Sequence, residues 1–256
     1  MSSGICLMIR QWQAKPCEDA RCSPQVKPLP ERRGLRAVRD EAVILTTSKP
    51  LVGLTVAKLS CVRGEREVFR DLSFQVAPGE MLTLVGPNGS GKSSLLRQLA
   101  GLLEVTDGEI NLDGTSEDQT IADVALYAGH LDAVKAPLSV SENLSFWAEF
   151  YGVSGARVED ALEVFSLGHL GHLPAGVLSA GQKRRLGLSR LALIDRPLWL
   201  LDEPTVSLDT ASIAALGDLM RAHLKTGGSI LAATHVDLGL EGTRTLDLSS
   251  NGGAST

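Results

Sequence analysis

The residues with the clearest chemical potential lie in one glycine-rich stretch, GPNGSGKS, at positions 86–93. Its members are Gly86, Pro87, Asn88, Gly89, Ser90, Gly91, Lys92 and Ser93, and Ser94 follows them. Glycines let the backbone wrap with its N–H groups pointing inward, where they and a following helix N-terminus can bind phosphate oxygens. Lys92 adds a positive charge, and the Ser93 hydroxyl is suited to bind Mg²⁺. The stretch therefore predicts a binding loop for the β- and γ-phosphates of a nucleotide.

A second group of reactive residues is the adjacent carboxylate pair Asp202 and Glu203, which follows the apolar run LWLL. Consecutive strand residues face opposite sides of a sheet, so the two acids are expected to have different roles. We expect Asp202 to hold Mg²⁺ and its waters. We expect Glu203 to act as the base for a water aimed at the γ-phosphate.

Strands and helices are needed to position both groups. Residues 82–85 predict a strand that leads into the glycine-rich loop, and residues 198–201 predict a strand that ends at the carboxylates. Leucines at helical spacing predict a helix after the loop: Leu95, Leu99 and Leu102. A helix from Ser212 to Thr226 is predicted after the carboxylates. Ligands of parallel α/β sheets bind at the C-terminal edge of the strands, where the carboxylates are expected.

The composition limits the classes of partner. The chain has 256 residues, of which 43% are hydrophobic, and a net charge of −5. Residues 1–50 hold nine Lys or Arg against five Asp or Glu, whereas the remaining residues hold 16 against 25. The acidic main part argues against nucleic acid as a partner. No apolar run approaches the roughly 18 residues of a bilayer-spanning helix, so a membrane role is expected to depend on a partner.

The first 50 residues differ from the rest. They are basic and rich in proline, with few periodic apolar positions, which predicts a disordered N-terminal extension. A true start of translation near Leu51 is an alternative. Three of the four cysteines lie here without a second metal-ligand pair, so reduced thiols in a reducing compartment are expected.

Between the loop and the carboxylates lies LSAGQ at residues 178–182, where Ser179 is a suitable helix N-cap. The glycine-rich loop, LSAGQ and the carboxylate pair follow one another in this order along the chain. On these three motifs, residues 52 to about 248 resemble an ATP-binding cassette (ABC) nucleotide-binding domain. The resemblance implies an α/β P-loop NTPase of the ABC type, an ATP hydrolase that uses ATP and Mg²⁺. Its domain would span residues 51–250, with a mixed sheet core, a small antiparallel β subdomain and a helical insertion subdomain at about residues 130–195.

The resemblance also implies roles for further residues. The signature sequence would comprise Leu178, Ser179, Ala180, Gly181 and Gln182, and the D-loop would comprise Ser207, Leu208 and Asp209. His235 would be a switch histidine that acts with Glu203 and Lys92 in catalysis. Two copies would pack head to tail, so that each ATP lies between one phosphate loop and the signature of the partner copy. A monomer should therefore hydrolyse ATP poorly.

Two positions depart from the family pattern. His130 stands where the family has glutamine, eight residues before Leu138, and a helix is expected to begin at Ser139 or Ser141. Its imidazole could touch Mg²⁺ or a bound water beside Ser93 and Asp202, or it could be an ordinary loop histidine. Arg63 stands where the family has the aromatic residue that stacks on adenine, and Phe69 is the other candidate.

The YAGH segment, the missing aromatic residue and LSAGQKRR together resemble the CcmA branch, the ATP-binding subunits of the haem exporter of cytochrome c maturation. This resemblance implies a homodimer bound to a CcmB-like membrane permease and to CcmC, CcmD and a CcmE-like chaperone. It would lie at the cytoplasmic face of the bacterial inner membrane as a peripheral subunit. Alternatives are a soluble ABC ATPase that acts as an assembly factor, or the ATPase subunit of another small exporter. The remaining histidines are expected to be solvated rather than haem ligands: His169, His172 and His223.

Overall fold

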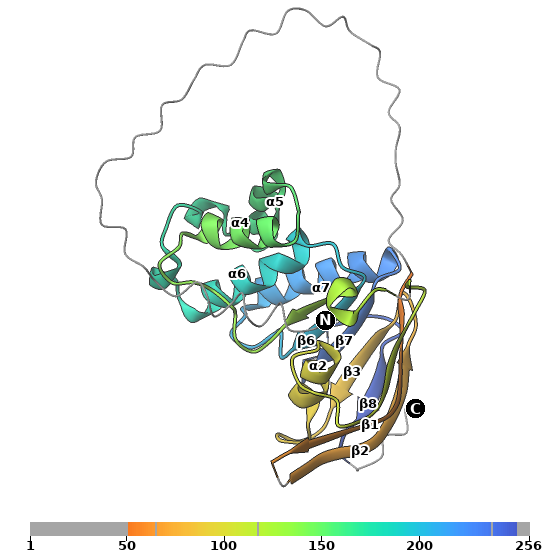
Figure 1. The fold of residues 1–256 in the computed structure, drawn as a ribbon. Coiled ribbons are helices and arrows are strands. Elements are labelled where there is room, and N and C mark those ends of the chain that lie inside the picture. Colours follow the sequence, from red (N-terminus) through yellow and green to blue (C-terminus); the bar gives the residue numbers. More distant parts are fainter. Residues whose placement is uncertain (1–50, 65, 117, 237, 250–256) are drawn as a thin grey trace, which may run out of the picture. The chain divides into compact units, whose positions relative to one another are not determined.

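A parallel sheet of five strands forms the centre of the computed structural model (Figure 1), which describes residues 51–249 apart from 65, 117 and 237. Its strand order is β5-β6-β7-β3-β8, and every pair of neighbours is parallel. The strands are β3 (Met81–Val85), β5 (Ala125–Ala128), β6 (Leu198–Asp202), β7 (Ser229–Ala233) and β8 (Arg244–Asp247). All residues of β6 and β7 are buried, as the continuous apolar sequence of β6 predicts.

The register of this sheet aligns the ends of four strands. Leu201 of β6 pairs with Ala128 of β5 on one side and with Ala232 of β7 on the other. Ala233 in turn pairs with Leu84 of β3. Because all these strands are parallel, their C-terminal ends lie at one edge of the sheet. The loops that begin at residues 86, 129, 203 and 234 therefore start side by side, although they are far apart in the sequence.

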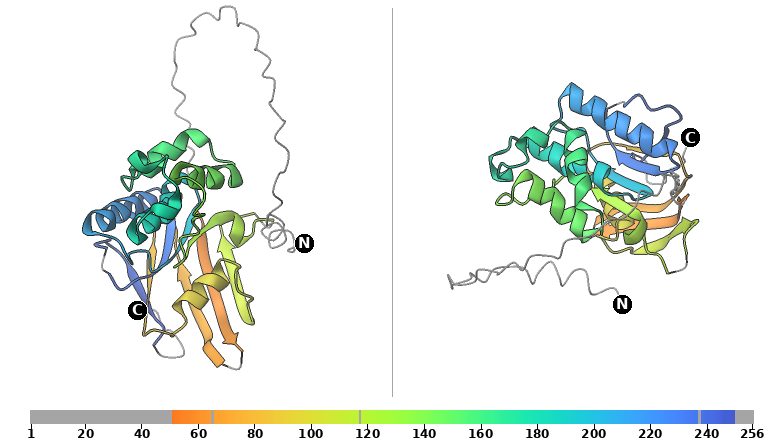
Figure 2. Two further views of the ribbon diagram at one scale, coloured as in Figure 1. Left: turned by 90° about the vertical axis from the view of Figure 1, so that its left-hand side faces the viewer. Right: turned by 90° about the horizontal axis from the view of Figure 1, so that it is seen from above.

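A second sheet is antiparallel and has the order β2-β1-β4. It comprises β1 (Gly53–Arg63), β2 (Arg66–Val76) and β4 (Asp107–Asp113). Its apolar face packs in one core cluster with helix α2 (Lys92–Leu99) and residues of the parallel sheet. In the turned view of Figure 2, α2 lies beside the strands of this sheet. Helix α2 buries Leu95 and Leu99, but it ends at Leu99, and Leu102 is 64% exposed beyond it.

Three α-helices of the described residues lie between β5 and β6 in the sequence. The short α3 (Ile121–Val124) precedes β5, and α4 (Val140–Phe150), α5 (Val158–Glu163) and α6 (Ala180–Leu193) follow it. Short 3₁₀ turns join them at Gly155–Arg157, Gly168–Leu170 and Ala175–Val177. Helix α7 (Thr210–Lys225) follows β6. Leu144 is fully buried here, and Trp147 and Tyr151 pack against the same core.

These elements confirm the predicted α/β architecture with an antiparallel β part and inserted helices. Parallel and antiparallel pairing are divided between the two sheets instead of being mixed within one. Of the two predicted starts for α4, the structure has the first, since Ser139 caps the helix by accepting from the Glu142 N–H. None of the helices among residues 51–249 is long and apolar enough to cross a bilayer. The predicted extension at residues 1–50 lies outside the described residues.

Asn143 holds the segment between β5 and α4. Its side chain is 4% exposed, accepts a hydrogen bond from the Lys135 N–H and donates to the carbonyls of Lys135, Leu138 and Ser139.

We predict that Asn143→Ala lowers the free energy of unfolding by about 2–4 kcal/mol, because buried polar groups lose their partners. Denaturant titration followed by circular dichroism measures the loss. The exposed Glu149 on the same helix is the control, and Glu149→Ala should change stability by less than about 0.5 kcal/mol. Equal effects of the two changes would contradict this role.

Candidate nucleotide-binding site

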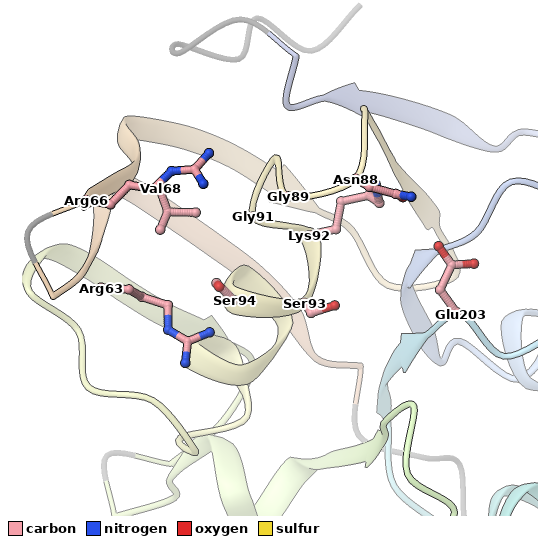
Figure 3. A pocket seen from close by; sticks show the side chains of 10 residues that line it. All are labelled: Arg63, Arg66, Val68, Asn88, Gly89, Gly91, Lys92, Ser93, Ser94 and Glu203. Atoms are coloured by element: carbon pink, nitrogen blue, oxygen red, sulfur yellow. The ribbon is translucent and has the colours of Figure 1, made fainter.

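A cavity of about 500 Å³ opens beside the glycine-rich loop (Figure 3). The loop and the start of α2 form one wall, the ends of β1 and β2 form another, and the residue after β6 closes the site. The loop contributes Asn88, Gly89, Gly91, Lys92, Ser93 and Ser94, the strands contribute Arg63, Arg66 and Val68, and Glu203 follows β6. Three cationic side chains and two hydroxyl groups thus face the cavity, which suits a phosphorylated ligand.

The loop needs its glycines for two separate reasons. Gly86, Gly89 and Gly91 have φ angles of 139°, 83° and 103°, which side-chain residues rarely adopt. Gly91 is also in close contact with β2, because a Cβ atom there would lie 2.6 Å from Cγ1 of Val68. Helix α2 begins immediately after Gly91, so its N-terminus faces the loop.

The side chain of Lys92 turns back into the loop from which it comes. Its Nζ donates to the carbonyl oxygens of Gly86 at 2.6 Å and of Pro87 at 3.2 Å. The residue is only 7% exposed, although it lines the cavity. The loop carbonyls therefore hold the ammonium group in place in the site.

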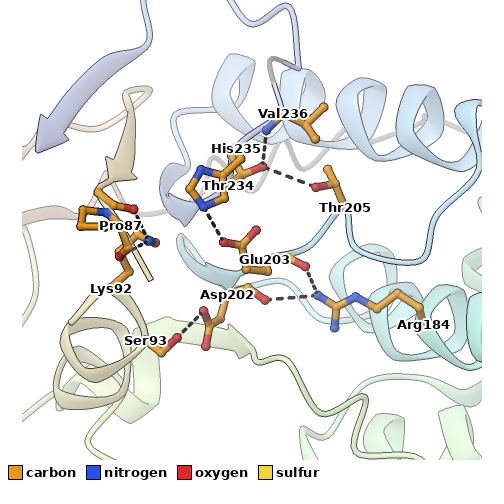
Figure 4. A network of polar contacts seen from close by, with 11 residues as sticks. Pro87, Lys92, Ser93, Arg184, Asp202, Glu203, Thr205, Thr234, His235 and Val236 are labelled. Atoms are coloured by element: carbon orange, nitrogen blue, oxygen red, sulfur yellow. Dashed lines mark hydrogen bonds and ion pairs between the residues drawn. The ribbon is translucent and has the colours of Figure 1, made fainter. Parts of the chain in front are cut away.

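Asp202 is a buried carboxylate that pairs with hydroxyl groups. Ser93 Oγ donates to its Oδ1 at 2.8 Å (Figure 4), and the Tyr127 hydroxyl donates to Oδ2 at 3.3 Å. Burial raises the pKa of Tyr127, which keeps its hydroxyl protonated as a donor. Asp202 is 1% exposed and forms no ion pair with the residues that the structure describes. Because a buried charge is costly unless a cation compensates it, this hydroxyl and carboxylate pair fits Mg²⁺.

Glu203 points away from Asp202, into the cavity. It has a φ angle of 49°, and its N–H donates to the carbonyl of Ala233 at 2.9 Å. Its Oε1 lies 3.5 Å from Nε2 of His235, which follows β7. The side chains of Glu203 and His235 are 25% and 56% exposed, respectively. The two acids therefore have different surroundings, but the cause is the left-handed φ of Glu203 just after β6 and not alternation along a strand.

The signature and D-loop segments lie against each other and do not line the cavity. Ser179 and Gln182 form a reciprocal capping box at the start of α6. A Cβ atom on Gly181 would lie 2.9 Å from the carbonyl oxygen of Ser207, so the two segments are in close contact. Asp209 caps α7 by accepting from the Ser212 N–H. Hydrogen bonds from the side chain and then from the backbone of Ser212 lower the pKa of the Asp209 carboxyl. Within one chain, the exposed Ser179 is left at the surface.

The candidates for contact with adenine and Mg²⁺ have different environments: Arg63, Phe69 and His130. Arg63 lines the cavity. Phe69 is a correction to the sequence analysis, because it is 3% exposed and packs in the core beneath the loop, where it has no free face for adenine. His130 is exposed, does not line the cavity and forms no hydrogen bond or ion pair with the described residues. Its expected contact with Mg²⁺ stays a prediction.

Sequence reasoning missed two residues beside the site. Tyr127 supports Asp202, and Arg184 donates to the main chain of Asp202 and Glu203. Arg184 stands in a run of three basic residues on a helix, and nothing in that pattern distinguishes it from a solvated face. His223 was expected to be solvated, but it is 4% exposed and its ring stacks on Trp199 at a centroid distance of 3.7 Å.

Comparison with known proteins identifies the family. Residues 69–206 match the model of the ABC transporter family. The chain is 52% identical over 182 residues to the cytochrome c biogenesis ATP-binding export protein CcmA of Nitrobacter winogradskyi, covering 71% of this chain and 91% of the relative. It is 48% identical over 196 residues to CcmA of Chelativorans, covering 76% and 97%. The chain belongs to the CcmA family of ABC transporter ATP-binding proteins.

The fold agrees with this assignment. A solved structure of the ATP-binding subunit of an ABC transporter superposes with a TM-score of 0.71 at 27% identity, covering 79% of this chain and 89% of that one. The resemblance predicted from the motifs is thereby confirmed at the level of the fold and the CcmA family. Membership of the ABC family implies ATP binding, which the lining of the cavity suits.

The close approach of Gly91 to β2 can be tested directly. We predict that Gly91→Ala abolishes detectable MgATP binding and lowers stability by at least about 2 kcal/mol, because the new Cβ must displace β2 and accept a left-handed φ. Gly89 is the comparison, since a Cβ there meets no atom within 4 Å. Gly89→Ala should cost about 1–2 kcal/mol through its φ angle alone. Calorimetry measures binding and thermal unfolding measures stability, and intact binding by Gly91→Ala would contradict the steric argument.

Proposed function

We propose that this chain is the ATP-hydrolysing subunit of a membrane ABC complex and that the cavity beside the glycine-rich loop is its active site. One observation carries the proposal. The Ser93–Asp202 pair joins the start of α2 to the end of β6, and the Glu203–His235 pair joins the residues that follow β6 and β7, beside one glycine-rich loop. A buried carboxylate for a cation next to a partly exposed carboxylate for a water is the arrangement that phosphoryl transfer to water requires.

The proposed roles follow from these positions. The N–H groups of the loop and of the α2 N-terminus bind the β- and γ-phosphates, and Lys92 neutralises part of their charge. Ser93 and Asp202 hold Mg²⁺, which supplies further positive charge on the phosphate oxygens when it is bound. Arg63 lines the cavity, and its guanidinium plane is proposed to stack on adenine. His130 lies two residues beyond the end of β5 and is proposed to contact the Mg²⁺ ion or one of its waters.

Glu203 is the proposed catalytic base. A water oxygen attacks the γ-phosphorus, the bond to the bridging β–γ oxygen breaks, and the proton of the water passes to the Glu203 carboxylate. ADP and inorganic phosphate are the products. His235 lies 3.5 Å from Glu203, and we propose that it orients this side chain and contacts the γ-phosphate.

The active form is proposed to be a homodimer. Ser179, Ala180 and Gly181 do not line the cavity of their own chain. Ser179 and Ala180 are exposed at the N-terminus of α6, whose N–H groups and positive dipole end suit the γ-phosphate of a second copy. The D-loop residues Ser207 to Asp209 would lie at the same interface. The proposed domain extends over residues 51–250, with its helical subdomain at about residues 130–195.

The wider assembly is proposed from the relatives, which are named as cytochrome c biogenesis ATP-binding export proteins. The complex would contain a CcmB-like permease, CcmC, CcmD and a CcmE-like chaperone, with haem or its loaded chaperone as the species that ATP turnover releases. This subunit would lie at the cytoplasmic face of the bacterial inner membrane. A soluble assembly-factor ATPase and a subunit of another small exporter share the same catalytic residues and differ only in their partners.

We predict that Glu203→Gln retains MgATP binding and lowers turnover by at least about 100-fold, the scale of a positioned acid–base group. The amide keeps the shape of the side chain but cannot take the proton. Calorimetry measures binding, and release of phosphate measures turnover. Glu142→Gln, an exposed carboxylate on α4, is the control and should leave turnover unchanged. Near-normal turnover by Glu203→Gln would reassign the base.

The membrane assignment predicts the partners of the full chain. A tagged chain that is expressed in its own host and purified from a detergent extract should recover an integral membrane protein in stoichiometric amount. Omission of detergent should remove that partner, because the contact is made within a membrane complex. Recovery with soluble assembly proteins alone would favour the assembly-factor alternative. Mass spectrometry of the purified complex distinguishes the two results.

A further inference from the structure

One buried arginine connects the helix that follows the signature sequence to two strand ends at the site. Arg184 lies in α6, five residues after Ser179, and is 5% exposed. Its Nη1 donates to the carbonyl of Gly129 at 2.7 Å and to Oδ1 of Asp132 at 3.0 Å. Its Nη2 donates to the main-chain carbonyls of Asp202 at 3.2 Å and Glu203 at 2.6 Å (Figure 4).

The contacts of Arg184 are made almost entirely with the main chain. A buried guanidinium group is costly unless its donors and charge are satisfied, and here three carbonyls and one carboxylate satisfy the two terminal nitrogens. Its Nε has no hydrogen-bond partner within the described residues, so the two terminal nitrogens make all of its hydrogen bonds there. A planar fork presents donors on two separate terminal nitrogens, so each nitrogen can serve a different strand end, whereas a lysine carries all its donors on one atom.

The backbone at Glu203 needs such support. Glu203 has a φ angle of 49°, a conformation that residues with side chains seldom adopt unless their surroundings hold it. Its N–H is fixed by Ala233 and its carbonyl by Arg184. The peptide groups on both sides of the Glu203 side chain are thus held, and this sets the direction of its carboxylate.

We propose that Arg184 is a positioning residue for the hydrolysis proposed above, joining the backbone of Glu203 and the loop after β5 to the signature helix. The guanidinium does not line the cavity, and it contacts Asp202, the proposed Mg²⁺ ligand, only through the main-chain carbonyl. Its effect on catalysis is therefore exerted through the aim of Glu203. The inference rests on the proposed function, because it assumes that Glu203 is the base.

The same contact gives a route between the surface for the second copy and the base. The segment that contains Asp132 is also pressed against α6, since a Cβ atom on Gly187 would lie 3.0 Å from the Asp132 carbonyl oxygen. Helix α6, this segment and the main chain of Glu203 thus form one connected unit. A displacement of the signature at the start of α6 must then be felt at the carbonyl of Glu203.

The test is Arg184→Met in the full chain, which keeps an apolar stem and removes every donor. We expect kcat for ATP to fall about 10- to 100-fold, because a catalytic group is misplaced, while KM and the Kd for MgATP stay within about twofold. Arg190→Met is the matched control. Arg190 lies on the same helix and is 7% exposed, but its Nε donates to Gly187 of its own helix and its guanidinium lies over Trp147. Its loss should lower thermal stability and leave kcat within about twofold of the wild type.

Asp132→Asn is a milder second variant that also serves if Arg184→Met does not fold. It leaves the three carbonyl contacts and removes the charge partner, so kcat should fall about two- to fivefold at unchanged KM. Arg184→Lys should recover only part of the activity that Arg184→Met loses. Unchanged kcat in folded Arg184→Met or in Asp132→Asn, or an equal loss in Arg190→Met, would overturn the inference. Absence of ATP turnover by the wild-type chain would instead overturn the proposed function, and the inference with it.

Discussion

The carboxylate of Asp202 is the group on which the arrangement of the site depends. It lies at the end of a strand that is buried along its whole length, and it is 1% exposed itself. A negative charge in such a place is tolerated only with hydrogen-bond donors and a compensating cation. Ser93 and Tyr127 supply the donors, and both come from neighbouring elements of the parallel sheet or its first helix. The same hydrogen bonds to Asp202 are therefore needed both for folding of the sheet and for assembly of the site.

The order of the strands explains why these residues meet. β6 lies between β5 and β7, and β3 is the next strand after β7. The loop after each of these strands therefore contributes one component of the proposed site: the glycine-rich loop after β3, Glu203 after β6, His235 after β7 and the segment at Gly129 after β5. Because β6 pairs with both β5 and β7, a side chain that holds the C-terminal end of β6 also influences the loops that follow these two neighbours. Arg184 does this from a helix that belongs to a different part of the chain.

Local sequence patterns predicted the elements well and the contacts between distant elements poorly. The apolar runs gave β3 and β6, and Ser179 was identified as the cap of α6 because capping depends on a few neighbouring residues. Phe69 could not be placed, since its side depends on how β2 pairs with β1, where the register shifts several times. The contacts of Arg184 reach back 55 residues to Gly129, and no local pattern contains them. The burial of His223 likewise depends on Trp199 in another element.

The solvent exposure of the proposed base argues for an incomplete site in the single chain. Glu203 is 25% exposed and His235 is 56% exposed, at a separation of 3.5 Å. In contact with water, the electrostatic interaction of such a pair is weak, and a water near the base is free to move. Covering this face with a second copy would remove water, strengthen the interactions of Lys92 and Glu203 with the phosphate, and fix the attacking water. The contacts of Arg184 connect α6 to the main chain of Glu203. Through them, the α6 surface that closes the partner's site would also adjust the base of its own chain, which would make hydrolysis in the two sites interdependent.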